Sequence, residues 1–118
     1  MCIRDSDDAA LAERLAARLL QAHPDLVGLY SAGAGNRGII AALRALRRDR
    51  AAPIVVAHEL TVHTRDALLS ETFTAVLHQD QEQEVENAIA ALRAMARSDK
   101  DFSPRPVRIQ IFLRDNVP

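Results

Sequence analysis

The chain has one cysteine, no long apolar run and almost no net charge, and each shortage excludes a class of protein. Its 118 residues carry a formal net charge of -1, so the surface as a whole lacks the basic face typical of a DNA-binding module. Cys2 stands alone, which excludes an intramolecular disulfide framework. The longest apolar runs have the length of a strand, and no charged-then-apolar leader opens the sequence, so we expect no membrane span.

Two kinds of catalytic chemistry also lack their motif. No serine stands in a G-x-S-x-G turn between a strand and a helix, so the chain offers no nucleophile elbow. Three histidines, His58, His63 and His78, lie in different segments and, even with Glu59 nearby, do not form the H-E-x-x-H pattern of zinc sites. We therefore expect no metal ion, no cofactor and no enzymatic activity.

The composition is that of one domain or part of one. Hydrophobic residues make up 48% of the chain and charged residues 26%, which is ordinary for a globular protein with a core. Residues 1–6 continue no periodicity and resemble a translated adapter read, so we interpret them as a non-native leader and 7–118 as the domain. The basic run at residues 47–50 closes an expected helix, where cations suit the negative end of the macrodipole.

Apolar periodicity predicts four helices that alternate with four strands. The helices are expected from a cap at Ser6 or Asp7 to Ala22, from near Asn36 to the basic run, and at 62–70 and 81–97; the strands are expected at 26–30, 54–56, 73–77 and 107–113. The β-branched run at 54–56 suits a strand buried on both faces. This order predicts an α/β fold in three layers, with a mostly parallel sheet and helices on both of its faces.

Polar residues follow three of the expected strands, at the point where each strand ends. Asn36 and Arg37 follow the first, Glu59 follows the second and Gln79 follows the third. Open parallel sheets bind ligands outside the carboxyl ends of their strands. Carboxylate, amide and guanidinium groups together suit vicinal hydroxyls, which donate and accept hydrogen bonds at once. These four residues are the predicted ligand-binding site for a sugar or polyol.

Each of these residues also has a purely structural interpretation. Asn36 stands where a cap for the second helix is needed, and Glu59 stands where the third helix could be capped. Gln79 follows a buried strand and has little local backbone to bind, so its structural interpretation is weaker. For Asn36 the two roles, capping the helix and binding the ligand, are compatible, and both remain possible interpretations.

A dinucleotide site is a further alternative. Gly33, Gly35 and Gly38 match G-x-G-x-x-G after a strand and before a helix, and Glu59 stands about 20 residues later. Ser31 and the next residue separate the strand from the first glycine, where the fingerprint requires a tight turn, and a whole helix precedes the strand. The glycines can instead serve only a sharp turn into the helix.

Five segments together resemble the later part of a LacI-type transcriptional regulator. They are AHPDLVGLY at 22–30, AGAGNRG at 32–38, HELT at 58–61, HQD at 78–80 and LRDNVP at 113–118. The resemblance implies a type I periplasmic-binding-protein-like fold, in which two α/β lobes clamp a sugar-like effector, and makes this chain mostly the C-terminal lobe. It also implies that Glu59 is a ligand-contacting acid, although many relatives carry Asp there, and that Gln79 is a ligand-contacting amide.

The resemblance further implies the partners of the parent protein. The expected partners are a small sugar or polyol effector, a second copy in a homodimer, and operator DNA bound through a headpiece that this chain lacks, in the cytoplasm and away from membranes. The same fold serves transport proteins, so a periplasmic sugar-binding component of an ABC transporter is the alternative. A fragment of an NAD-binding Rossmann-type enzyme is the other.

Overall fold

The structure, a computed structural model, describes residues 8–46 and 51–118, which fall into two compact units. Unit 1 runs to Leu77 and includes Ile111–Pro118; unit 2 is His78–Gln110. The leader interpreted at 1–6, the helix caps proposed at Ser6 or Asp7 and the basic run at 47–50 lie outside the described residues.

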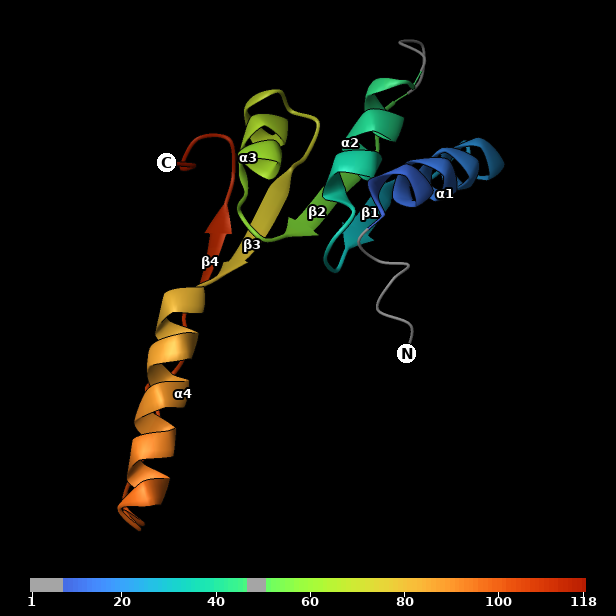
Figure 1. The fold of residues 1–118 in the computed structure, drawn as a ribbon. Coiled ribbons are helices and arrows are strands. Elements are labelled where there is room, and N and C mark those ends of the chain that lie inside the picture. Colours follow the sequence, from blue (N-terminus) through green and yellow to red (C-terminus); the bar gives the residue numbers. More distant parts are fainter. Residues whose placement is uncertain (1–7, 47–50) are drawn as a thin grey trace. The chain divides into compact units, whose positions relative to one another are not determined.

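Helices and strands alternate in the predicted order, and the first three strands pair in parallel, so the sheet is mostly parallel (Figure 1). The elements up to the third strand are α1 (Ala9–Ala22), β1 (Gly28–Ser31), α2 (Asn36–Arg44), β2 (Ile54–His58), α3 (Val62–Leu69) and β3 (Ala75–Gln79). β1 pairs with β2 and β2 with β3, both in parallel, and β4 (Ile109–Phe112) completes the order β1-β2-β3-β4. α2 and α3 are therefore crossover helices between neighbouring parallel strands.

The core of unit 1 lies against one face of the strands. Val55, Ala57 and Val76 are fully buried and cluster with apolar residues of α1, α2 and α3. Side chains alternate between the faces of a strand, and Ile54 and Tyr30, on the other face, are 61% and 62% exposed. Within unit 1 the described helices therefore cover one face of the 54–56 strand, and its burial on both faces stays a prediction.

α1 begins where an aspartate can cap it. The Asp8 carboxylate accepts hydrogen bonds from the backbone N–H groups of Ala10 and Leu11, at 2.9 and 3.0 Å. The helix ends at Ala22, ahead of the predicted His23-Pro24 stop. The predicted terminus is thus confirmed at this end.

α1 packs directly on α2, and the contact needs a glycine. A Cβ at Gly38 would overlap the carbonyl oxygen of Ala9 and stand 2.6 Å from the backbone nitrogen of Glu13. No side chain fits there, so Gly38 allows the backbones of the two helices to approach. This contact fixes the start of α2 beside the start of α1.

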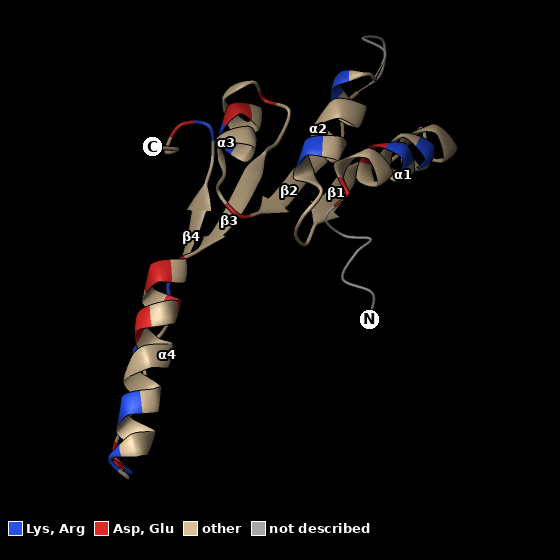
Figure 2. Ribbon diagram, in the orientation of Figure 1, with Lys and Arg blue, Asp and Glu red and all other residues tan. Residues whose placement is uncertain are grey.

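Unit 2 is built on α4 (Gln81–Ala96), whose charges suit its dipole. Asp80 accepts a hydrogen bond from the Gln83 N–H at 3.0 Å and caps the helix. Figure 2 shows acidic residues in the first turns of α4 and basic residues in the last. Within unit 2, the apolar residues that recur along α4 at helical spacing are exposed: Val85, Ile89, Leu92 and Met95.

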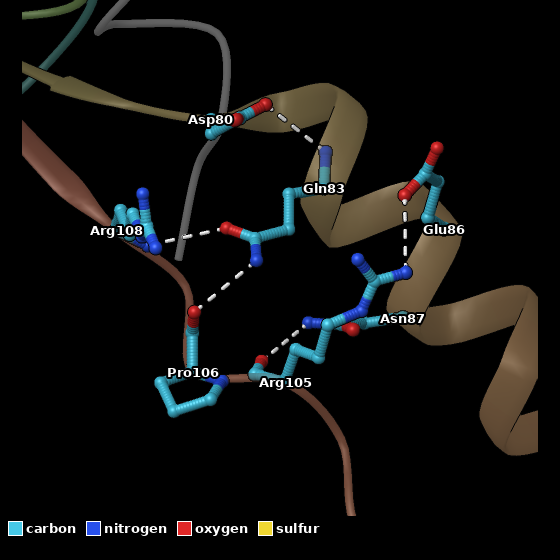
Figure 3. A network of polar contacts seen from close by, with 7 residues as sticks. All are labelled: Asp80, Gln83, Glu86, Asn87, Arg105, Pro106 and Arg108. Atoms are coloured by element: carbon cyan, nitrogen blue, oxygen red, sulfur yellow. Dashed lines mark hydrogen bonds and ion pairs between the residues drawn. The ribbon is translucent and has the colours of Figure 1, made fainter.

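An extended segment is fastened along α4 by two amide side chains (Figure 3). Gln83 donates to the Pro106 carbonyl at 3.2 Å and accepts from the Arg108 N–H at 3.3 Å. Asn87 donates to the Arg105 carbonyl at 2.7 Å. Because residues four apart share a helix face, the two amides form one row that binds the segment backbone.

Within the described ranges, no helix combines the length and the apolar character needed to cross a membrane.

Candidate functional site

A hollow of about 230 Å³ lies at the carboxyl ends of β1 and β2, within unit 1. We call it the strand-end hollow. Its lining residues are Ala9, Ala34, Gly35, Asn36, Arg37, Glu59, Thr61 and His63. Three of the four predicted ligand-binding residues, Asn36, Arg37 and Glu59, thus share one hollow. Gln79 ends β3 and belongs to unit 2, so its part in the site stays a prediction.

Asn36 ties the ends of two strands together. Its side-chain oxygen accepts a hydrogen bond from the Ser31 hydroxyl at 2.7 Å, and its side-chain nitrogen donates to the His58 carbonyl at 3.0 Å. Each polar atom keeps further hydrogen-bonding capacity, since an amide has two N–H donors and two lone pairs. Asn36 therefore holds the floor of the hollow in place and presents an amide there.

The capping role weighed for Asn36 is wrong. Gly35 occupies the cap position of α2 with φ 96° and ψ 0°, and no side chain caps this helix. A positive φ is strained for residues with a Cβ, which explains the glycine. Asn36 is the first residue inside α2, and its amide points to the strands rather than to the helix end.

Glu59 is held in an unusual backbone conformation at the rim of the strand-end hollow. Its φ is 68°, in the left-handed region that few residues with side chains adopt. Two bonds fix it there: its N–H donates to the Leu77 carbonyl at 2.8 Å, and its carbonyl accepts from the Thr64 hydroxyl at 2.8 Å. The side chain is exposed. Strained residues of this kind concentrate at ligand sites.

The cap of α3 is Thr61, so the capping role weighed for Glu59 is wrong. The Thr64 N–H donates to the Thr61 hydroxyl at 3.3 Å, and the Thr61 N–H donates to the Thr64 hydroxyl at 2.8 Å. This reciprocal pair is a capping box. It leaves the Glu59 carboxylate without a capping bond to α3.

The glycines of the G-x-G-x-x-G match have structural explanations of their own. Gly35 supplies the positive φ of the α2 cap, and Gly38 admits α1. A Cβ at Gly33 would meet nothing within 4 Å. Because no close approach requires a glycine at position 33, the pattern does not need a dinucleotide to explain it.

The three histidines His58, His63 and His78 have different surroundings. His58 hydrogen-bonds through Nε2 to the Tyr30 hydroxyl, with the two rings edge to face at a centroid distance of 5.4 Å. His63 lines the strand-end hollow, and His78 belongs to unit 2. Among the residues that the structure describes, no group of three or more His, Cys, Asp or Glu side chains is placed to hold a metal ion.

The chemistry of the strand-end hollow suits a polyhydroxylated ligand. Glu59 can accept from two hydroxyls, Arg37 offers a planar fork of donors, and Asn36 can do both. Thr61 and His63 also line the hollow and were missed by the sequence reasoning. For Thr61 the T-x-x-T spacing before an apolar run was an available signal of a cap; for His63 there was none, since its position depends on how α2 and α3 pack.

Residues 3–100 match the family of the periplasmic binding protein domain. The chain belongs to this family. No curated protein matches the chain. The fold class predicted from the sequence is confirmed: the α/β order, with an open and mostly parallel sheet, is that of one lobe of a periplasmic-binding-protein-like fold.

Solved structures share this fold at low sequence identity. GanP, a glucose-galactose binding protein from Geobacillus stearothermophilus, superimposes with a TM-score of 0.82 at 17% identity, over 94% of this chain and 40% of that one. AraP, an arabinose binding protein from the same organism, gives 0.72 at 20% identity, over 92% and 40%. An ABC transporter solute binding protein from Agrobacterium vitis with bound D-fucose gives 0.78 at 17%, over 92% and 38%. The chain therefore spans about two fifths of the length of these structures.

Proposed function

We propose that this chain is the ligand-sensing lobe of a LacI-type transcriptional regulator and that it binds a sugar or polyol without catalysis. The observation that carries the proposal is the strand-end hollow, where Asn36, Arg37 and Glu59 meet at the carboxyl ends of two parallel strands. Membership of the periplasmic binding protein domain family supports a binding function in place of an enzymatic one.

In the proposed mechanism the ligand is held by charge-assisted hydrogen bonds. Glu59 accepts bonds from a vicinal pair of hydroxyls, Arg37 donates to the ring or hydroxyl oxygens, and Gln79 adds an amide from the next strand end. The ligand binds the open and closed arrangements of the two lobes with different affinity and so shifts their populations. In a homodimer this shift changes the spacing of the paired headpieces on operator DNA.

The C-terminal LRDNVP segment, one of the five that carry the resemblance to the regulator, folds as part of unit 1. In the LRDNVP stretch, the Asn116 side chain accepts from the Leu113 N–H at 2.6 Å and donates to the Ile111 carbonyl at 3.1 Å. The stretch thereby forms a turn after β4, and Val117 packs against the core. These contacts give Asn116 and Val117 a structural role in unit 1.

A periplasmic sugar-binding component of an ABC transporter is the second candidate. The solved structures with this fold include sugar-binding proteins of transporters, two of them with bound D-fucose or D-arabinose. Both candidates use the same hollow for the same class of ligand. They differ in compartment, since the regulator acts in the cytoplasm, and in what lies upstream of this segment.

Reading the coding frame upstream and measuring operator binding separates the candidates. The regulator predicts an upstream helix-turn-helix segment and a complete protein whose operator affinity changes when D-arabinose, D-galactose or an inositol is added. A cleavable leader upstream, with no operator binding, would contradict it and favour the transporter.

The isolated chain provides a further check, because it offers only one wall of the proposed cleft. Half of the hydrogen-bond partners are then missing and the site stays hydrated, so we expect binding of sugars to this chain alone to be weak or undetectable by isothermal titration. Micromolar affinity of the chain alone for a pentose, hexose or inositol would contradict the two-walled site.

A further inference from the structure

A second hollow, of about 250 Å³, shares residues with the strand-end hollow in unit 1. We call it the α2–α3 groove. It is lined by Arg37, Ile40, Ala41, Arg44, His63 and Asp66. Arg37 and His63 line both hollows, so the two lie side by side. A ligand that contacts these two side chains can therefore extend from one hollow toward the other.

The α2–α3 groove has a basic lining. Arg37 and Arg44 are seven residues apart and so share one face of α2, two turns apart. Basic segments on α2 are visible in Figure 2. His63 faces them from α3, and Asp66 is the only acidic residue among the lining. The formal charge of the groove lining is thus positive. In the strand-end hollow, by contrast, the charge of Glu59 balances that of Arg37.

The donors of the α2–α3 groove are available to a ligand. Within residues 8–46 and 51–118, neither the Arg37 side chain nor the His63 side chain forms a hydrogen bond or ion pair with another described residue. Arg44 makes one long hydrogen bond, 3.4 Å to the Ser70 hydroxyl. Little internal bonding would therefore be lost when an incoming acceptor takes these donors.

We propose that the ligand is an anionic sugar: its hydroxyls bind in the strand-end hollow, and its phosphate or carboxylate binds Arg37, Arg44 and His63 in the α2–α3 groove. This inference rests on the proposed sugar-binding function and names the class of ligand for it. Guanidinium groups bind both kinds of anion as two-pronged donors.

Isothermal titration of the complete protein with matched ligands tests the proposal. D-arabinose is compared with D-arabinose 5-phosphate and D-galactose with D-galacturonate, while inorganic phosphate alone tests for a free anion. We expect at least one anionic sugar to bind about tenfold tighter than its neutral counterpart, and this preference to decrease as salt is raised. We expect inorganic phosphate alone to bind more weakly than the sugar phosphate.

Charge variants of the groove give the second arm. Arg44→Gln should weaken binding of the preferred anionic sugar about threefold to tenfold, and Asp66→Asn should strengthen it, because the first removes an attracting charge and the second a repelling one. Arg18→Gln, which removes an exposed arginine of α1 outside both hollows, is the matched control and should change nothing.

Each result bears either on the anionic ligand or on the proposed sugar-binding function. Equal affinity for neutral and anionic sugars, or no opposite response of Arg44→Gln and Asp66→Asn, overturns the anionic ligand and leaves the proposed sugar-binding function standing. Inorganic phosphate bound as tightly as the sugar phosphate overturns the joint ligand in favour of a free anion. If no sugar binds in either form, the proposed function itself fails.

Discussion

Single residues of unit 1 differ sharply in how much change they tolerate, and Gly38 tolerates least. Gly38→Ala would place a methyl group against the backbone of α1, 2.6 Å from the Glu13 nitrogen and 3.0 Å from the Ala12 Cβ. We expect the free energy of unfolding to fall by about 1–3 kcal/mol, because the two helices must separate to admit it. Urea denaturation followed by circular dichroism measures this.

Gly33→Ala is the matched control from the same G-x-G-x-x-G pattern. No atom lies within 4 Å of the added Cβ, so we expect stability to change by less than about 0.5 kcal/mol. Equal losses in the two variants would show that the α1–α2 contact does not require a glycine.

Glu59 combines backbone strain with a proposed ligand role, and one variant separates the two effects. Glu59→Gly should raise the free energy of unfolding by up to about 1 kcal/mol, since glycine adopts a φ of 68° without strain. The same change should weaken sugar binding in the complete protein, because the carboxylate is lost. Thermal melts and isothermal titration measure the two effects.

Glu71→Gly provides the comparison for Glu59. Glu71 also has a positive φ, 58°, but it lies outside both hollows, where it forms an exposed ion pair with Arg114. We expect a similar relief of strain with sugar affinity unchanged. Loss of sugar affinity in both variants would mean that the carboxylate of Glu59 is not the cause.

At the scale of residues, the sequence could predict which side chains lie together, but not the hydrogen bonds that fix their positions. The end of a parallel strand is readable from apolar runs, so Asn36, Arg37 and Glu59 could be placed at one edge. The bonds of Asn36 to Ser31 and to the His58 carbonyl join residues 5 and 22 positions away, and no local pattern encodes them. The positive φ of Glu59 likewise depends on bonds to Thr64 and Leu77.

At the scale of elements, the connection from β2 to α3 depends on one buried hydroxyl. Thr64 is fully buried, and its hydroxyl donates to the Glu59 carbonyl and accepts from the Thr61 N–H, both at 2.8 Å. Thr64→Val keeps the shape of the side chain but leaves the Glu59 carbonyl and the Thr61 N–H without their hydrogen-bond partner. We therefore expect the free energy of unfolding to fall by about 1–3 kcal/mol. Chemical denaturation measures it.

Thr64→Ser keeps the hydroxyl and serves as the control. It removes only a methyl group, so we expect it to cost about 1 kcal/mol, less than the valine variant. If serine proved as destabilising as valine, packing of the methyl group rather than the capping box would hold this connection.

In unit 2 the row of amides on α4 makes its own prediction. Gln83→Ala removes the acceptor of the Arg108 N–H, so we expect that amide to exchange its hydrogen about fivefold faster, equivalent to about 1 kcal/mol. Hydrogen exchange followed by NMR measures it. Gln81→Ala, at the first residue of the same helix, should leave the Arg108 exchange rate unchanged; a matching acceleration would point to fraying of α4 instead.

Periodicity predicted the order of elements well and the surroundings of each element less well. The starts of α2, α3 and α4 were recovered near Asn36, Val62 and Gln81, because the apolar periodicity changes from that of a strand to that of a helix there. The exposure of Ile54 was not recovered, since an apolar run does not reveal which sheet face has a covering helix in its unit. Phe73 was placed in a strand, yet it is buried in the turn before β3.

At the scale of the whole molecule, this chain spans about two fifths of the length of the solved structures that share its fold. Population shift between lobe arrangements requires contacts on both sides of the ligand. In the proposed function the residues of this chain contact the ligand, and the regulation of DNA binding requires the second lobe as well.

The most direct test of the account is isothermal titration of the complete protein with its preferred sugar, for the wild type and for Glu59→Ala and Gln79→Ala. Hydrogen bonds to a charged group contribute about 1.5–3 kcal/mol, so we predict a loss of affinity of at least tenfold for Glu59→Ala and a smaller loss for Gln79→Ala. Unchanged affinity and unchanged effector-induced DNA release in both variants would show that the ends of β2 and β3 do not bind the ligand.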